Sequence, residues 1–131
     1  VLLQPTSPFR RHSDLNDALN VLFDDEKVDS VVSVEAVPDH YSPAFLMKIE
    51  DGNLVPFLGS ETLCARRQDA PKIYDLNASI YIWNRKNLLS SKNLINKKTI
   101  FFQMPYSRSI DIDDKLDLIM VKHVLKNNLN K

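Results

Sequence analysis

The chain has 131 residues with 17 basic and 17 acidic side chains, so its formal net charge is zero. A balanced charge gives no general attraction to nucleic acid or to an anionic membrane, and any anion must be bound by a local cluster. The single cysteine, Cys64, excludes an internal disulfide and is compatible with a reducing cytoplasm. Because no apolar run approaches the roughly 20 residues that span a bilayer, we expect a cytoplasmic protein that binds neither nucleic acid nor membrane.

The first 37 residues have the pattern of a strand, a helix and a second strand. Residues 1–4 form a short apolar run that ends at Pro5, and residues 30–37 form a valine-rich run. Between them Ser13 is a candidate N-cap, followed by apolar residues at helical spacing. This order predicts a βαβ unit and therefore a mainly parallel sheet.

The segment from 41 to 77 has a different character. Two apolar runs, 45–49 and 54–57, flank an Asp-Gly pair, which is typical of a hairpin turn. Residues 59–77 are polar and too long for an ordinary connection in a compact domain. We expect either a functional loop or an arm that packs against another chain.

The last part of the chain completes one α/β domain over 1–131. Residues 78–83 and 99–103 have the composition of strands, and 84–91 of a short helix or turn. A final helix with a wide apolar stripe follows residue 114, and we expect residues 127–131 to fray.

Two acids near the C-terminus are candidates for a metal site. Asp111 and Asp113 are separated by one apolar residue, so on an extended strand their carboxylates would point the same way. Hard oxygen ligands of this kind suit Mg²⁺, which keeps other positions for water and phosphates. A second role is open for Asp113, because Asp before a helix is a favoured N-cap.

Other polar residues have two interpretations each. Gln4 lies at the carboxyl end of a predicted strand, where α/β proteins bind ligands, or is paired with loop backbone. Arg66, Arg67 and Gln68 form a cluster of donors that suits a carboxylate or phosphate, or else an exposed charged loop. Tyr81 is either structural or part of a sugar-acid pocket.

Two kinds of site are not expected. Cys64 has no neighbouring His or Asp in the sequence, which argues against a cysteine nucleophile. Gly52 and Gly59 are the only glycines, so a glycine-rich phosphate loop cannot be built here. The phosphate cradle of any nucleotide site is expected to lie outside these residues.

Three segments, LLQPTSPFR at 2–10, RRQDAPKIYDLNASIYIWN at 66–84 and SIDIDD at 109–114, together resemble the acylneuraminate cytidylyltransferases. Their order and spacing match, and the likeness covers nearly the whole chain. The resemblance implies an incomplete Rossmann-like, three-layer nucleotidyltransferase fold with an extended β-hairpin dimerisation arm, in a homodimer. It also implies Mg²⁺-dependent transfer of CMP from CTP to a nine-carbon keto sugar acid, with release of pyrophosphate.

The resemblance also suggests roles for individual residues in the core of the site. Gln4 and Tyr81 match residues that contact the sugar acid, and Asp111 and Asp113 match the aspartates that hold Mg²⁺. Ala78 departs from the pattern, because it stands where the family usually has glycine.

Further matches fall in the middle of the chain. Arg66, Arg67 and Gln68 match a motif near the dimer contact, where a partner chain reaches toward the active site. Lys48 is the candidate for a lysine near the sugar carboxylate. Asp114 stands where threonine or serine is common.

The family's N-terminal loop, rich in Gly, Arg and Lys, has no counterpart in this sequence. We therefore expect residues 1–131 by themselves to bind CTP poorly and to be inactive. Alternatives stay open: the acceptor could be legionaminic, pseudaminic or 3-deoxy-octulosonic acid. The chain could also be a non-catalytic remnant that keeps only dimerising and sugar-binding surfaces.

Overall fold

A computed structural model describes residues 1–59, 66–90 and 93–128 of the chain. Three predictions touch residues outside this part. They concern Cys64, residue 91 of the segment predicted at 84–91, and residues 129–131 of the predicted fraying end. The chain forms two compact units, one from Val1–Glu35 with Leu76–Lys131 and the other from Ala36–Asp75.

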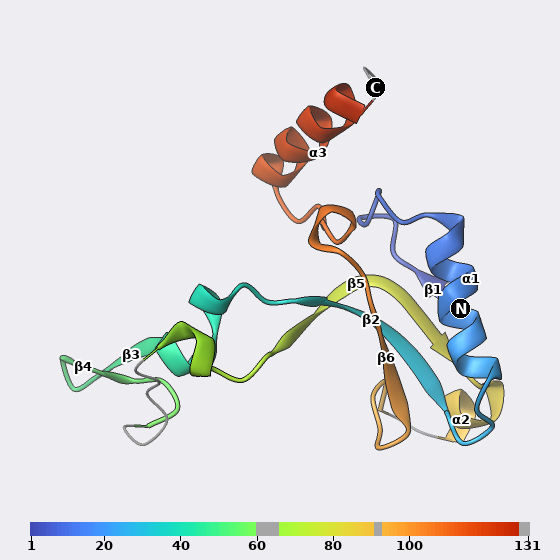
Figure 1. The fold of residues 1–131 in the computed structure, drawn as a ribbon, viewed down its shortest axis with the longest axis horizontal. Coiled ribbons are helices and arrows are strands. Elements are labelled where there is room, and N and C mark those ends of the chain that lie inside the picture. Colours follow the sequence, from blue (N-terminus) through green and yellow to red (C-terminus); the bar gives the residue numbers. More distant parts are fainter. Residues whose placement is uncertain (60–65, 91–92, 129–131) are drawn as a thin grey trace. The chain divides into compact units, whose positions relative to one another are not determined.

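The first unit is built on a four-stranded sheet. Its strands are β1 (Leu2–Leu3), β2 (Ser30–Ala36), β5 (Tyr74–Trp83) and β6 (Thr99–Gln103), in the order β1-β5-β2-β6. β1 pairs antiparallel with β5, and β2 pairs in parallel with β6. The ribbon shows β5 running back beside β2 (Figure 1). The sheet is therefore mixed, and the predicted mainly parallel sheet is wrong.

Hydrogen bonds within and just beyond the ends of β2 and β5 show that these two strands are antiparallel. Val37 N donates to Ile73 O, and Ser33 Oγ donates to Asn77 Oδ1. From the first pair to the second, the residue number falls by four on one side and rises by four on the other, as in an antiparallel pair. The second unit leaves the sheet at the end of β2 and returns at the start of β5. A chain that returns without a crossover enters antiparallel to the strand it left, and β5 thus separates β1 from β2.

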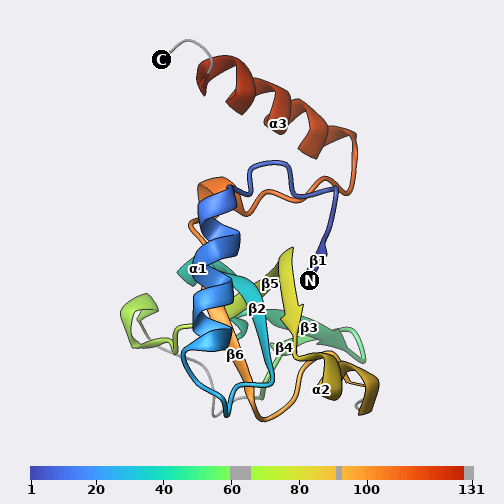
Figure 2. The ribbon, with the colours of Figure 1, turned by 90° about the vertical axis from the view of Figure 1, so that its right-hand side faces the viewer.

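Helix α1 (His12–Phe23) covers one face of this sheet (Figure 2). The helical spacing of its apolar residues brings Ala18 against a buried cluster that includes Ile80, Ile82 and Met104. The helix begins earlier than predicted: its N-cap is Arg11, not Ser13. Asp14 sets this start, because its Oδ2 accepts a hydrogen bond from Arg11 N at 2.9 Å.

The second unit contains the predicted hairpin. Strands β3 (Met47–Glu50) and β4 (Asn53–Pro56) pair antiparallel across the Asp51-Gly52 turn. Both turn residues have positive φ, +51° and +79°, as a type I′ turn requires. Short 3-10 turns flank the hairpin: η1 (Asp39–Tyr41), η2 (Pro43–Phe45) and η4 (Arg67–Asp69).

The remaining helices belong to the first unit: α2 (Arg85–Ser90), the 3-10 turn η5 (Tyr106–Arg108) and α3 (Lys115–Asn128). Asp114 caps α3, because its Oδ1 accepts from the backbone N–H groups of Leu116 and Asp117 at 2.7 and 3.0 Å. The capping role considered for Asp113 thus belongs to its neighbour. Of the helices in the described residues, none is long and apolar enough to cross a bilayer.

Candidate functional site

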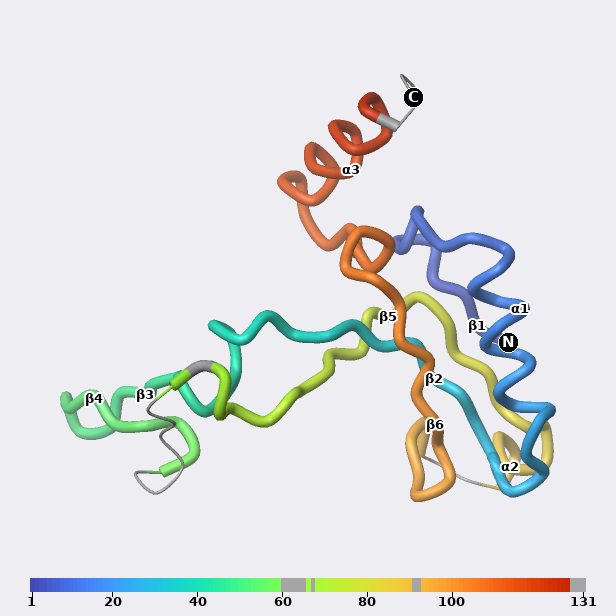
Figure 3. The backbone as a smooth tube through the Cα atoms, in the orientation of Figure 1, coloured from blue at the N-terminus to red at the C-terminus, as the bar shows by residue number. Residues whose placement is uncertain are grey.

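Two loops from distant parts of the sequence lie side by side at one end of the first unit (Figures 2 and 3). One is residues 4–11, between β1 and α1, and the other is residues 104–114, between β6 and α3. Ile112 N donates to Thr6 O at 3.0 Å, and Ser7 Oγ lies 3.5 Å from Asp111 Oδ1. These contacts bring the first and third sequence motifs together.

Gln4 stands at the start of the first loop. Its Oε1 accepts a long hydrogen bond, 3.4 Å, from Thr6 Oγ1, while its Nε2 has no partner among the described residues. Its backbone is fixed by Arg10, whose Nη1 donates to Gln4 O at 3.2 Å and to Ser79 O at 2.7 Å. The backbone at Gln4 is thus held in place, and its side-chain amide nitrogen is available to a ligand.

Tyr81 lies on β5 directly opposite Leu2. Side chains alternate along a strand, and Ile80 and Ile82 join the core under α1, so Tyr81 emerges on the opposite face of the sheet. Its ring stacks on that of Trp83 with centroids 5.7 Å apart and planes inclined by 5°. The antiparallel pairing brings Tyr81 onto the strand next to the one that leads into Gln4.

The acidic segment is irregular rather than a strand, so the geometric argument for Asp111 and Asp113 as strand neighbours is wrong. Asp111 is half-buried, and its Oδ1 accepts from Ser7 Oγ and from Ile112 N at 3.2 Å. Asp113 is exposed, and its backbone N–H donates to Asp117 Oδ2 at 3.0 Å. In the described part of the chain, neither Asp111 Oδ2 nor the Asp113 carboxylate has a hydrogen-bond or ion-pair partner.

The two carboxylates have the ligand chemistry that Mg²⁺ prefers. Residues 1–59, 66–90 and 93–128 contain no group of three or more His, Cys, Asp or Glu side chains that could hold a metal ion by themselves. Mg²⁺ does not need one, because it is commonly held by one or two carboxylates together with water and substrate phosphates. Asp111 and Asp113 are the residues that could hold it here.

A buried ion pair fixes the second loop against α1. Arg108 donates to both carboxylate oxygens of Asp14, at 2.6 and 3.1 Å, and the Asp14 side chain is 3% exposed. Burial by itself would raise the pKa of Asp14, but the hydrogen bonds from Arg108 and from the Arg11 backbone, with the charges of both arginines, hold this pKa below its usual value. The carboxylate therefore stays charged at neutral pH.

Sequence reasoning missed the residues that build this end of the sheet. Arg10, Asp14, Asn77, Arg108 and Ser109 were not singled out as determinants of its geometry, yet each ties one of the two loops to a neighbouring element. No sequence signal marked Asn77, because it ends the predicted loop 59–77, whereas β5 already begins at Tyr74.

Lys48, Arg66 and Gln68 belong to the second unit, and their predicted roles stay predictions. Lys48 Nζ forms an exposed ion pair with Glu50 Oε1 at 2.6 Å, a kind that contributes little to stability. Arg66 and Gln68 are exposed, and Arg67 begins the turn η4.

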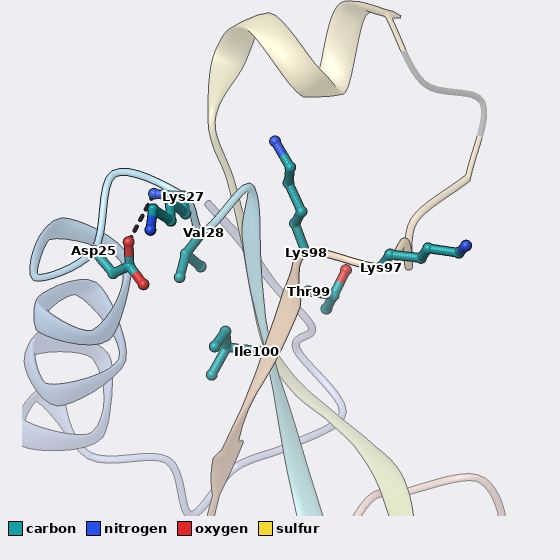
Figure 4. Close-up of a pocket in the computed structure, with 7 residues that line it drawn as sticks. All are labelled: Asp25, Lys27, Val28, Lys97, Lys98, Thr99 and Ile100. Carbon is teal, nitrogen blue, oxygen red and sulfur yellow. Dashed lines mark hydrogen bonds between the residues drawn. The ribbon is translucent and has the colours of Figure 1, made fainter.

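The first unit also has a pocket of about 230 Å³ at the start of β2 and β6, away from the two loops. Lys27, Lys97 and Lys98 line it, but their amino groups point in different directions (Figure 4). It contains none of the predicted site residues, and its lysines do not converge on a point where an anion would sit.

The sequence matches no family model, but it aligns with several curated proteins. It is 33% identical over 125 residues to the post-translational flagellin modification protein B of Campylobacter coli, covering 95% of this chain and 51% of that protein. It is 39% identical over 93 residues to a CMP-N,N'-diacetyllegionaminic acid synthase of Campylobacter jejuni, covering 70% of this chain and 39% of that protein. It is 33% identical over 121 residues to an N-acylneuraminate cytidylyltransferase of Streptococcus agalactiae, covering 92% of this chain and 29% of that protein. The chain belongs to the acylneuraminate cytidylyltransferase family.

The family resemblance predicted from the three motifs is thereby confirmed. In this family member, the motifs around Gln4 and Asp111 meet at one end of the sheet through the Thr6–Ile112 contact. The chain spans from 29% to 51% of the length of these three relatives.

Proposed function

We propose that the protein carrying this chain transfers CMP from CTP to the 2-hydroxyl of a nine-carbon keto sugar acid and releases pyrophosphate. The observation that carries the proposal is the meeting of the Gln4 loop and the Asp111 segment, joined by the Thr6–Ile112 hydrogen bond at 3.0 Å. The names of the relatives supply independent support, because two of the three describe CMP-sugar synthesis or cytidylyl transfer.

The roles of the chain's own residues follow from their chemistry. Gln4 would orient the sugar acid through its amide donors, and Tyr81 would line the same pocket on the neighbouring strand. Asp111 and Asp113 would hold Mg²⁺, which when bound neutralises negative charge on the phosphates and on the departing pyrophosphate. The 2-hydroxyl oxygen would lose its proton to water and form a bond to the α-phosphorus, in line with the breaking bond from that phosphorus to the bridging oxygen, which leaves with the pyrophosphate.

The proposed acceptor is a sugar acid such as N-acetylneuraminate, with legionaminic, pseudaminic or 3-deoxy-octulosonic acid as the alternatives. Identity is 39% to the diacetyllegionaminic acid synthase and 33% to the N-acylneuraminate cytidylyltransferase, so each of these two acceptors has the support of a relative. Pseudaminic and 3-deoxy-octulosonic acids remain as comparison substrates. A panel of these acids, each assayed with CTP for pyrophosphate release, will identify the acceptor by kcat/KM.

We also propose a partial Rossmann-like fold, cytoplasmic localisation and a homodimer. The hairpin would serve as the dimerisation arm, and Lys48, Arg66 and Gln68 on the second unit would approach the partner's sugar-acid site. Supporting this role, Ile49 and Leu54 lie opposite each other on the hairpin and are 76% and 67% exposed. An apolar pair in water is the kind of surface that a second copy would cover.

The metal role has a direct test in the full-length gene product. Asp111→Asn should lower the rate of pyrophosphate release by at least about 100-fold, because loss of mere outer-shell partners of a metal already costs 10–100-fold. Asp25→Asn, an exposed acid on the same unit, is the control and should leave the rate unchanged. A near-normal rate in Asp111→Asn would overturn the metal role.

A further inference from the structure

A line of buried hydrogen bonds joins β2 to β5 and ends in the turn before Asp111. Ile80 N donates to Ser33 Oγ at 2.7 Å, and Ser33 Oγ donates to Asn77 Oδ1 at 2.6 Å. Asn77 Nδ2 donates to Ser109 Oγ at 2.9 Å, and Ser109 Oγ donates to Pro105 O at 3.1 Å. Ser33, Asn77 and Ser109 are at most 4% exposed.

The direction of every bond in this line is determined by its two ends. A backbone N–H can only donate, so Ser33 Oγ must accept from Ile80 and pass its own proton toward Asn77. The amide therefore presents its oxygen to Ser33 and its nitrogen to Ser109. Since Pro105 O can only accept, Ser109 Oγ completes the line without an unsatisfied group.

The line constrains the segment that carries the predicted metal ligands. Between the end of β6 and the start of α3, the chain has no regular structure apart from the turn η5. Ser109 lies two residues before Asp111, and Asn77 ties it to β5 from within the protein interior. Arg108 and Ile112 are tied to α1 and to Thr6, so the backbone on both sides of Asp111 is fixed.

We propose that Asn77 is a positioning residue for the metal-binding aspartates, acting through Ser109, with Ser33 setting the orientation of its amide. This inference rests on the proposed function, because it assumes that Asp111 holds the metal. Asn77 is 4% exposed and its amide bonds to Ser33 and Ser109, so its influence on Asp111 passes through Ser109. It thereby determines where the Asp111 carboxylate lies relative to the Gln4 loop.

The same sheet offers a matched control. Ser30 lies on β2, like Ser33, and both side chains are fully buried. Ser30 Oγ bonds to Thr99 Oγ1 at 2.8 Å, at the opposite end of the strand from the acidic segment. A Ser→Ala change at either position removes one buried hydroxyl, but only Ser33 belongs to the line that leads to Ser109.

The test measures Mn²⁺ binding by electron paramagnetic resonance in the full-length gene product, without turnover. Ser109→Ala removes the acceptor of Asn77 and should raise the Mn²⁺ dissociation constant about 10- to 100-fold. Ser33→Ala should also raise the Mn²⁺ dissociation constant. Ser30→Ala should leave the dissociation constant unchanged, even if it lowers the melting temperature as much as Ser33→Ala does. Asp111→Asn is measured alongside as the reference for loss of a ligand.

Each outcome decides the matter. Weaker Mn²⁺ binding in Ser109→Ala but not in Ser30→Ala supports the positioning role. If Asp111→Asn weakens binding while Ser109→Ala does not, the positioning role fails and the metal role survives. Equal weakening in Ser109→Ala and Ser30→Ala reduces the effect to general destabilisation and also overturns the inference. If Asp111→Asn leaves binding unchanged, the proposed metal role and the inference fail together.

Discussion

The loop end of the first unit and the hairpin of the second depart from the usual distribution of side chains in opposite ways. In the first, polar groups such as Asn77 and Asp14 are buried and hydrogen-bonded. In the second, apolar side chains such as Ile49 and Leu54 are exposed. Buried polar groups specify a single geometry, whereas exposed apolar groups gain free energy only when another surface covers them. One region is suited to hold a site, and the other is suited to be covered.

The largest effect is expected at the exposed apolar pair of the hairpin. Replacing both Ile49 and Leu54 with Lys should weaken homodimerisation by about 4 kcal/mol, because each removes a side chain worth roughly 2 kcal/mol on burial. The free energy of unfolding of the monomer should change little, since both side chains are exposed. Sedimentation equilibrium measures the association. Unchanged association in the double variant would exclude the hairpin as the dimer contact.

A change at the buried ion pair between Asp14 and Arg108 tests the loop end of the first unit. Asp14→Asn leaves Arg108 without its negative partner and should lower the free energy of unfolding by about 3 kcal/mol, at the low end for buried pairs because the Arg108 side chain is 26% exposed. Urea unfolding measures the loss. The matched control is Asp29→Asn, whose partner Lys98 is 3.9 Å away and 62% exposed. A pair of that kind is worth about 1 kcal/mol or less.

The same pair makes stability depend on pH in a defined direction. The pKa of Asp14 is lower in the folded chain than its unfolded value of about 3.9. A depressed pKa contributes stability that is fully present above the unfolded value and is lost as the pH falls through the folded value. Acidification below about pH 4 should therefore cost the wild type more stability than Asp14→Asn. Parallel pH curves for the two proteins would contradict the assignment.

The smallest effect concerns the backbone next to Asn77. Ala78 has φ +54°, and Asn77 Oδ1 accepts from Ser79 N across it at 3.3 Å. A left-handed alanine costs about 1–2 kcal/mol, part of which glycine recovers. Ala78→Gly should thus raise the free energy of unfolding by about 1 kcal/mol, measured by urea unfolding. Gly52→Ala, at φ +79° in the hairpin turn, is the reverse change and should destabilise.

The sequence predicted the elements that depend on local signals. Asp51-Gly52 predicted the hairpin, and the spacing of apolar residues predicted α1, because turn geometry and helix periodicity act over a few neighbours. The strand at 99–103 was confirmed with its bounds unchanged. These features needed no knowledge of the rest of the chain.

The parts that failed depend on contacts between distant residues. The mixed sheet arises because β5 enters between β1 and β2, and no local pattern specifies the direction in which it returns. The bonds that shape the site join residues 44 and 94 positions apart, as in Ser33–Asn77 and Asp14–Arg108. For the same reason the spacing of Asp111 and Asp113 suggested a strand, where the fold has an irregular segment.

Arg10 lies at the point where the pairing of β1 with β5 ends. One guanidinium nitrogen occupies the carbonyls of both Gln4 and Ser79, the backbone acceptors just beyond the last paired residues of β1 and β5. A shift of β1 by one position against β5 would therefore break both bonds. A slip of that size would turn Gln4 to the other face of the sheet, so this arginine protects the placement of a side chain that it never touches.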